Sequence, residues 1–200
     1  MSLKSCHYQT LVVASSNPGK VEEFVDFLAP LQFQVLAQPE GMQIEEHGIT
    51  FAENARLKAL EVATRTGYMA LADDSGLCVD ALGGEPGVYS SRYASNDQQR
   101  IEKLLTALEG IRERSAHFSS ALCLAMPQNE VLLEVEGICR GVITNVPRGD
   151  HGFGYDPIFE VLDKGLTFAE MSSEQKRACG HRGKAFSLLE PKLKQLVMAK

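Results

Sequence analysis

The stretch TLVVASSNPGKVEEFVDFL, residues 10–28, decides the fold because it contains a strand, a polar turn and a helix in direct succession. The β-branched and apolar run at 10–14 predicts a buried strand, and SSNPG at 15–19 is typical of a turn. Apolar residues then recur at helical spacing with acidic residues between them, which predicts a helix that ends before Pro30. A strand that leads through a polar turn into a helix indicates an α/β fold.

The rest of the chain continues this alternation and then becomes mostly extended. Thr50 and Glu53 fit a capping box at the start of a second helix, and Gly67 marks its end. Pro191 lies inside the last helical pattern and is expected to kink or split that helix. The other predicted elements are strands over 33–37, 68–72, 77–82, 118–126, 131–139, 141–144 and 155–161 and a helix over 97–109.

These patterns together predict an α/β fold with a mixed sheet, because helices alternate with strands at first and strands dominate the second half. The length of 200 residues fits one domain. No internal repeat, low-complexity segment or change of composition marks a linker. We therefore predict a single domain that spans residues 1–200.

The composition excludes several classes of protein. Hydrophobic residues make up 44% and charged residues 23% of the chain, which excludes disorder over most of its length. The 20 basic and 26 acidic residues give a net charge of −6, which disfavours general nucleic-acid binding. No apolar run approaches the roughly 18–20 residues of a membrane-spanning helix, and no secretion signal opens the chain. We therefore expect a cytoplasmic protein that binds neither nucleic acid nor membrane.

The first candidate site is the turn before the first predicted helix. Ser15, Ser16, Asn17 and Lys20 surround the amino end of that helix, where free N–H groups and the helix dipole favour an anion such as phosphate. A lysine in the first turn of a helix is unfavourable for the helix dipole, so its presence indicates an anionic partner. The alternative is that Ser16 or Asn17 only caps the helix.

The second candidate site is the acidic pair Asp73-Asp74, which follows an apolar strand. Adjacent carboxylates at a strand end repel each other unless a cation or a proton lies between them or water solvates them. Mg²⁺ takes carboxylate oxygens together with substrate phosphate oxygens, and Glu45-Glu46 offers a second acidic pair. The alternative is a simple β-turn over 73–76 with solvated acids.

Two further clusters complete the candidates. The segment GDHGFGYDP, residues 149–157, has glycines that permit close approach of a ligand and aromatics that could stack on a planar base. Its alternative is a glycine-rich hairpin whose aromatics pack on the core. Lys176, His181, Arg182 and Lys184 form a basic cluster in an acidic protein, which indicates either a small polyanion site or an ordinary exposed turn.

Five motifs then resemble, in order and over nearly the whole chain, the inosine and xanthosine triphosphate pyrophosphatase family. These are ASSNPGK (14–20), EEHGITFAENARLKA (45–59), ADDSGLCVDALGGEPGVYSSRYA (72–94), GFGYDPIF (152–159) and HRGKA (181–185). Agreement of five ordered motifs outweighs the separate alternatives above. The resemblance implies Mg²⁺-dependent hydrolysis of non-standard purine nucleoside triphosphates, namely ITP, dITP and XTP, to the monophosphate and pyrophosphate.

The resemblance also implies residue roles. Glu46 and Asp74 are the implied magnesium ligands, and Asp74 is also the implied proton acceptor, with Lys20 as the second catalytic residue. Two departures from the bacterial pattern, Ser16 for glycine and Gly180 for serine, leave the charged groups in place. The residues implied to hold the substrate are Ser15, Ser16, Asn17, Lys20, Ser75, Phe153, Gly154, Tyr155, Asp156, Lys176, His181 and Arg182.

The fold implied by the resemblance is a long, curved mixed sheet with helices around two lobes and a substrate cleft between them. A homodimer is implied as well. Two other functions fit some of the same residues: a Maf-like pyrophosphatase for pyrimidine or modified nucleotides, and a sensor that binds a purine triphosphate without cleaving it. Retention of Lys20, Glu46 and Asp74 argues against the sensor, because mere binding does not require a catalytic carboxylate.

Overall fold

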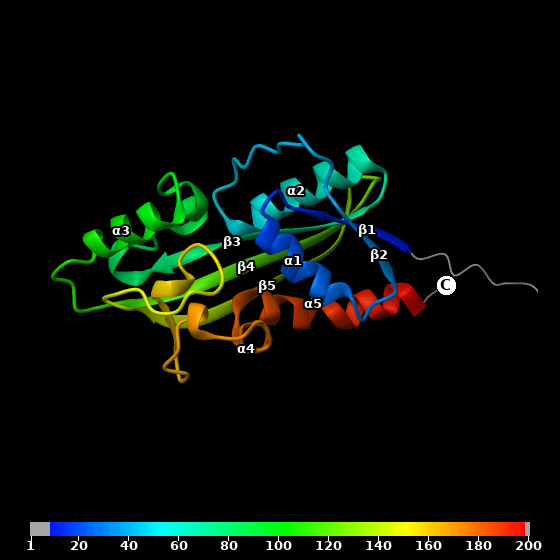
Figure 1. Ribbon diagram of the computed structural model, residues 1–200. Coiled ribbons are helices and arrows are strands. Elements are labelled where there is room, and N and C mark those ends of the chain that lie inside the picture. The colour runs from blue at the N-terminus through cyan, green and yellow to red at the C-terminus, as the bar shows by residue number, and fades with distance from the viewer. Residues whose placement is uncertain (1–8, 199–200) are drawn as a thin grey trace, which may run out of the picture.

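A six-stranded mixed sheet forms the centre of the protein in the computed structural model, which describes residues 9–198 (Figure 1). In spatial order, the strands are β2 (Phe33–Ala37), β1 (Gln9–Ala14), β3 (Met69–Val79), β4 (Ser115–Met126), β5 (Glu130–Ile143) and β6 (Phe159–Val161). β1 runs parallel to both β2 and β3, whereas β3, β4, β5 and β6 pair antiparallel. The predicted α/β fold with a curved, mixed sheet is therefore confirmed.

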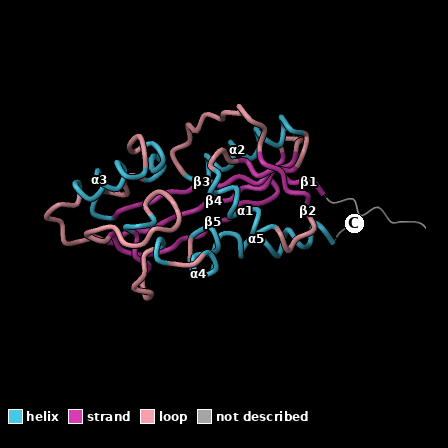
Figure 2. Tube along the Cα trace, in the orientation of Figure 1, coloured by secondary structure: helices cyan, strands magenta, loops and turns pink. Residues whose placement is uncertain are grey.

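Helices cover both faces of this sheet. The helices are α1 (Pro18–Leu28), α2 (Phe51–Thr66), α3 (Asp97–Ala107), α4 (Ser173–Cys179) and α5 (His181–Met198). Helices α1 and α5 lie on one face and α2 lies on the other, while α3 sits beyond them at the far end of the long strands (Figures 1 and 2). None of these helices is long and apolar enough to cross a membrane.

The core is divided into two lobes. At the β1 end, apolar side chains of α1 and α5 pack on one face of the sheet, and small side chains of α2, mostly alanines, pack on the other. At the far end, α3 packs with the ends of β3, β4 and β5 and with the segment 155–171. The residues between the two lobes line the cavity described below.

The structure corrects the predicted break between two strands at 73–76. β3 is continuous, and Asp73 and Asp74 are buried in its ladder opposite Leu122 and Ala121. Neither the predicted turn nor solvation of the two carboxylates occurs. Burial of both acids inside a strand is tolerated because each meets cationic or hydrogen-bonding side chains from other elements.

Two other expectations are also wrong in detail. The strand predicted at 141–144 is not separate but forms the end of β5. Glycine at position 141 allows the Glu160 carbonyl oxygen to approach, because that oxygen lies 2.3 Å from the position that a Cβ would take. Pro191 does not split α5, which continues to Met198. Pro191 is exposed, so water can bind the carbonyl group that loses its helical partner. The capping box of Thr50 and Glu53 is confirmed.

Candidate active site

A cavity of about 820 Å³ lies between the two lobes. Its walls come from the turn between β1 and α1, the segment 38–46, β3, the segment 88–91, the segment 153–156 and the start of α5. We call it the central cavity. Of the predicted site residues, it is lined by Ser15, Ser16, Asn17, Lys20, Glu46, Asp74, Ser75, Phe153, Gly154, Tyr155, Asp156, His181 and Arg182.

The turn before α1 is held by its own polar side chains. Asn17 is the N-cap: its Oδ1 accepts a hydrogen bond from the Lys20 N–H at 3.2 Å. The Ser15 hydroxyl accepts one from the Asn17 N–H, also at 3.2 Å. A side chain at Gly19 would lie 2.8 Å from the Phe153 ring, so glycine is needed for this close approach. Capping by Asn17 and an anion site are compatible, because a cap uses only part of the free N–H groups.

Asp73 anchors two cations on the α1 and α5 side of β3. Its carboxylate lies 2.7 Å from Lys20 Nζ and 3.4 Å from Arg182 Nε, and it accepts a 2.6 Å hydrogen bond from the Ser120 hydroxyl. Burial alone would raise the pKa of Asp73, but Lys20 and Arg182 outweigh it and hold this pKa well below its usual range. The pKa of Lys20 is lowered, chiefly by burial. Asp73 is therefore a permanent anion that positions Lys20 and Arg182.

Arg182 uses its remaining donors to hold the wall of the cavity. Its Nη2 donates to the Ser75 hydroxyl at 2.8 Å, and Ser75 in turn donates to Asp73 at 3.0 Å. Its Nη1 pairs with Glu23 of α1 at 3.0 Å. The guanidinium also lies 5.4 Å from the centre of the Phe153 ring. Arg182 is thus fixed in orientation before any ligand arrives.

Asp74 points to the opposite face of β3, toward α2. Its Oδ2 accepts a hydrogen bond from Asn54 Nδ2 and its Oδ1 lies beside Lys58 Nζ, each at 3.1 Å. Burial raises the pKa of Asp74 above its usual range, and Lys58 opposes this only in part. Lys58 also forms an ion pair with Glu46 at 2.5 Å. Burial alone would raise the pKa of Glu46, but the Lys58 charge outweighs it and the pKa is lowered. Of the two adjacent aspartates of β3, Asp74 is the one whose environment favours uptake of a proton.

Glu46 and Asp74 fit the needs of a Mg²⁺ ion. Both carboxylates reach the same Lys58 ammonium group, so their oxygens converge. Mg²⁺ is usually held by one or two carboxylates plus water and substrate phosphates rather than by a complete protein cage. Within residues 9–198, no cluster of three or more acidic, His or Cys side chains forms such a cage. Glu45, the other half of the acidic pair, is exposed and does not line the cavity.

The segment 152–156 carries Phe153 and is held in place by hydrogen bonds to the Asp156 carboxylate. Asp156 accepts hydrogen bonds from the Phe153 N–H at 3.0 Å and from Lys176 Nζ at 2.8 Å. Gly152 has φ +79°, and a Cβ there would lie 2.0 Å from Asp156 Oδ2, so this position requires glycine. Tyr155 is buried in the far lobe, where its hydroxyl donates to the Ser90 carbonyl group, and it also lines the central cavity.

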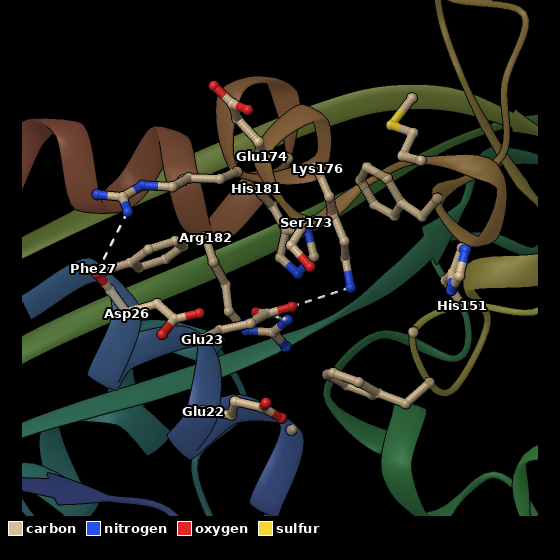
Figure 3. A pocket seen from close by; sticks show the side chains of 18 of the residues that line it. Glu22, Glu23, Asp26, Phe27, His151, Ser173, Glu174, Lys176, His181 and Arg182 are labelled. Atoms are coloured by element: carbon tan, nitrogen blue, oxygen red, sulfur yellow. Dashed lines mark hydrogen bonds and ion pairs between the residues drawn. The ribbon is translucent and has the colours of Figure 1, made fainter. Parts of the chain in front are cut away.

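A second cavity of about 830 Å³, shown in Figure 3, shares lining residues with the central cavity. Lys176 lines this neighbouring cavity and not the central one, and Figure 3 shows its ammonium group directed at Glu23, 3.0 Å away. Phe153, His181 and Arg182 line both cavities and therefore form the partition between them. The predicted residues thus surround two adjacent spaces that share part of their walls.

His181 is the first residue of α5 and is buried in this partition. Its ring stacks on Phe118 with 4.7 Å between centroids. Neither ring nitrogen has a hydrogen-bond partner among the described residues. Burial lowers the pKa of His181 well below its usual value, so the ring is neutral and offers one donor and one acceptor.

The profile of the Ham1 family matches residues 11–192, which is most of the chain. This chain belongs to the Ham1 family. The resemblance seen in the sequence motifs is thereby confirmed.

Similar proteins extend over the full length of this Ham1 family member. A Prochlorococcus marinus (strain MIT 9313) protein named dITP/XTP pyrophosphatase is 60% identical over 197 residues, 98% of this chain and 97% of that protein. A Synechocystis protein of the same name is 51% identical, over 90% of this chain and 93% of that protein. The solved structure of a HAM1 protein from Coxiella burnetii matches with a TM-score of 0.86 and 42% identity, covering 94% of this chain and 99% of that chain.

Sequence reasoning did not single out Glu23, Asn54 and Lys58, although each contacts a predicted site residue. A usable signal existed for two of them. Asn54 and Lys58 are four residues apart on α2, so they share a face, and the small apolar residues beside them mark that face as buried. A buried amide and a buried ammonium group on one helix face require polar partners.

Proposed function

We propose that this Ham1 family member hydrolyses non-standard purine nucleoside triphosphates, namely dITP, XTP and ITP, to the nucleoside monophosphate and pyrophosphate. One observation carries the proposal: Lys20, Arg182, Glu46 and Asp74 line a single cavity, which shares Phe153, His181 and Arg182 with a second cavity beside it. Cations and converging carboxylates suit a metal-bound triphosphate, and an aromatic partition suits a purine. The names of the similar proteins support the same activity.

The triphosphate would lie in the central cavity. The amino end of α1, with Ser15, Ser16 and Asn17 in its turn, offers N–H groups and hydroxyls to phosphate oxygens. Lys20 adds a positive charge from the same helix, and the Ser75 hydroxyl lies beside the acidic pair. These groups would neutralise negative charge that grows on the departing pyrophosphate.

Glu46 and Asp74 would hold Mg²⁺, which supplies positive charge to the phosphates when it is bound. Asp74 would accept a proton from the water molecule that attacks the α-phosphorus, and the bond from that phosphorus to the bridging oxygen would break. Burial favours the protonated form of Asp74, which makes it a better base than an exposed aspartate. Asn54 holds its second oxygen and would keep the carboxylate oriented.

The purine base would occupy the neighbouring cavity, with Phe153 as the wall that it shares with the central cavity. Gly154, Tyr155 and Asp156 line the central cavity and would form the wall beside the sugar. Lys176, His181 and Arg182 reach the neighbouring cavity and can donate to an acceptor on the base. Hypoxanthine and xanthine carry an oxygen acceptor at position six, whereas adenine carries an amino donor. A donor buried against a donor costs about 1–3 kcal/mol, which favours the six-oxo bases roughly ten-fold to more than a hundred-fold.

One assay tests the proposal against its rivals. Purified protein and Mg²⁺ are incubated separately with dITP, XTP, ITP, ATP, GTP and UTP, and released pyrophosphate is measured. We expect preferential release from dITP, XTP and ITP. Preferential cleavage of UTP would instead indicate a Maf-like pyrophosphatase, and no release from any nucleotide would indicate a sensor.

We further propose a cytoplasmic homodimer whose protomer, residues 1–200, is a single domain. The family profile runs without interruption over 11–192, which supports one domain. The net charge of −6 supports a small-molecule substrate rather than nucleic acid. Sedimentation analysis of the purified chain tests the dimer, which a monomer at micromolar concentration would contradict.

A further inference from the structure

Lys58 occupies the space between the two proposed magnesium ligands. Its ammonium group lies 2.5 Å from Glu46 Oε1 and 3.1 Å from Asp74 Oδ1, and the side chain is only 12% exposed. The two remaining oxygens also face donors. Asn54 Nδ2 donates to Asp74 Oδ2, and Arg92 Nη2 lies 3.7 Å from Glu46 Oε2. Every oxygen of the converging pair thus has a resident donor or cation.

Two converging carboxylates in a partly buried site repel each other, and a cation between them removes that repulsion. In the structure this cation is an ammonium group carried by the protein itself. A divalent ion bound by Glu46 and Asp74 needs the same oxygens at about 2.1 Å, closer than the ammonium group lies. The ion and the Lys58 ammonium group therefore compete for one position.

We propose that Lys58 is a built-in counter-cation of the metal site. In the metal-free protein it holds Glu46 and Asp74 together, and it leaves this position when a divalent ion binds. The inference rests on the proposed function only in taking Glu46 and Asp74 as the metal ligands. Lys58 also lines the central cavity, so the displaced ammonium group enters the space proposed for the triphosphate. Metal and polyphosphate would then favour each other's binding through the same lysine.

The protein contains a matched control for this arrangement. Lys176 also bridges two carboxylates, 3.0 Å from Glu23 and 2.8 Å from Asp156, and its side chain is 13% exposed. Neither Glu23 nor Asp156 is a proposed metal ligand. Replacement of Lys176 by methionine therefore removes an equivalent lysine bridge without opening a metal site.

The test compares the wild-type protein with Lys58→Met and Lys176→Met. Melting temperatures are measured in EDTA and in Mg²⁺, and the Kd of Mn²⁺ is measured by calorimetry without nucleotide. Both substitutions should lower the melting temperature in EDTA, and Mg²⁺ should restore it only in Lys58→Met. Lys58→Met should bind Mn²⁺ about ten-fold or more tightly than the wild type, because a competing charge is gone. Lys176→Met should bind Mn²⁺ like the wild type.

Unchanged or weaker Mn²⁺ binding in Lys58→Met would overturn the proposal, as would the absence of Mn²⁺ binding in both proteins. If Lys58→Met does not fold, the wild-type protein with ¹⁵N-labelled lysine serves instead. Its Lys58 ammonium signal, assigned by its loss in Lys58→Arg, should shift on addition of Mg²⁺ alone, and an unchanged signal would overturn the proposal.

The pyrophosphate assay distinguishes this proposal from the proposed function. Cleavage of dITP together with unchanged Mn²⁺ affinity in Lys58→Met would refute only the counter-cation. Tighter Mn²⁺ binding in Lys58→Met, together with no cleavage of any nucleotide by the wild-type protein, would support the counter-cation and refute the hydrolase.

Discussion

The two faces of β3 place chemically identical side chains in opposite environments. Asp73 faces α1 and α5, where two cations, Lys20 and Arg182, compensate its charge. Asp74, the next residue, faces α2, where it shares the single Lys58 with Glu46. Burial disfavours ionisation at both positions, yet the pKa of Asp73 is held far below its usual range and the pKa of Asp74 is raised.

For these two neighbouring carboxylates, the cations close to each one decide the direction of the pKa shift, because burial acts on both in the same direction. Asp73 remains an anion and serves as an anchor for Lys20 and Arg182. Asp74 is poorly compensated and can take up a proton. Substitutions on the two faces should therefore separate catalysis from stability, and the following predictions run from the largest expected effect to the smallest.

Asp74→Asn should abolish most of the proposed activity while the protein stays folded. Asparagine keeps the shape and can still contact Asn54, but it cannot accept a proton. We expect kcat for dITP to fall by roughly a hundred-fold to ten-thousand-fold, as for loss of a general base. Circular dichroism checks the fold. Activity within a few-fold of the wild type would show that the α2 face of β3 is not the catalytic one.

Asp73→Asn should act mainly on stability. It leaves Lys20 and Arg182 buried without their shared anion, and removal of one partner from a buried ion pair costs about 3–5 kcal/mol. Urea unfolding at pH 7 measures this loss in the free energy of unfolding. If Asp73→Asn lowers the free energy of unfolding no more than Asp74→Asn does, the two faces of β3 do not differ in their contribution to stability.

The pH dependence of stability should also differ between the wild type and Asp73→Asn. Because folding lowers the pKa of Asp73, its contribution is fully present above the ordinary carboxyl pKa and is lost as the pH falls through the lower folded value. The difference between the two unfolding free energies should therefore narrow as the pH falls below about 4. Urea titrations at several pH values measure it, and a constant difference would contradict the assignment.

Ser120→Ala should have the smallest effect. It removes one hydrogen bond to Asp73 but leaves both cations, so we expect a loss of about 1–2 kcal/mol in the free energy of unfolding and little change in kcat. Ser119→Ala is the control on the other face of β4, where the hydroxyl donates to the exposed Glu136. Ser119→Ala should lower the free energy of unfolding by less than Ser120→Ala, because water can replace the hydroxyl donor at Glu136. An equal loss in the two variants would argue against a special role for Asp73.

Much of the site was predictable from local sequence patterns. The order of strand, turn and helix around 10–28 predicted β1 and α1, and the capping box at Thr50 predicted the start of α2. The motif resemblance selected residues that, apart from Lys176, line the central cavity. Lys176 lies instead in the neighbouring cavity, a distinction that depends on which side of Phe153 its long side chain passes.

The break expected at 73–76 failed for a reason that local patterns do not contain. Two adjacent acids are rare inside a buried strand, so local patterns favour the end of a strand at this point. The strand is possible because Lys20 and Arg182 compensate Asp73 on one face, while Asn54 and Lys58 contact Asp74 on the other. All four residues lie 15 or more positions away in the sequence.

The sequence by itself determined the α/β class, the family and many of the polar residues from which the site is built, because periodicity and motif order are properties of the chain. Only the tertiary structure decided that Asp73 and Asp74 have different chemistry and that Lys58 stands between the proposed metal ligands. The physical reason is that a pKa and an ion pair depend on distances between charges a few ångströms apart, and those distances exist only once α1, α2 and α5 have packed around β3.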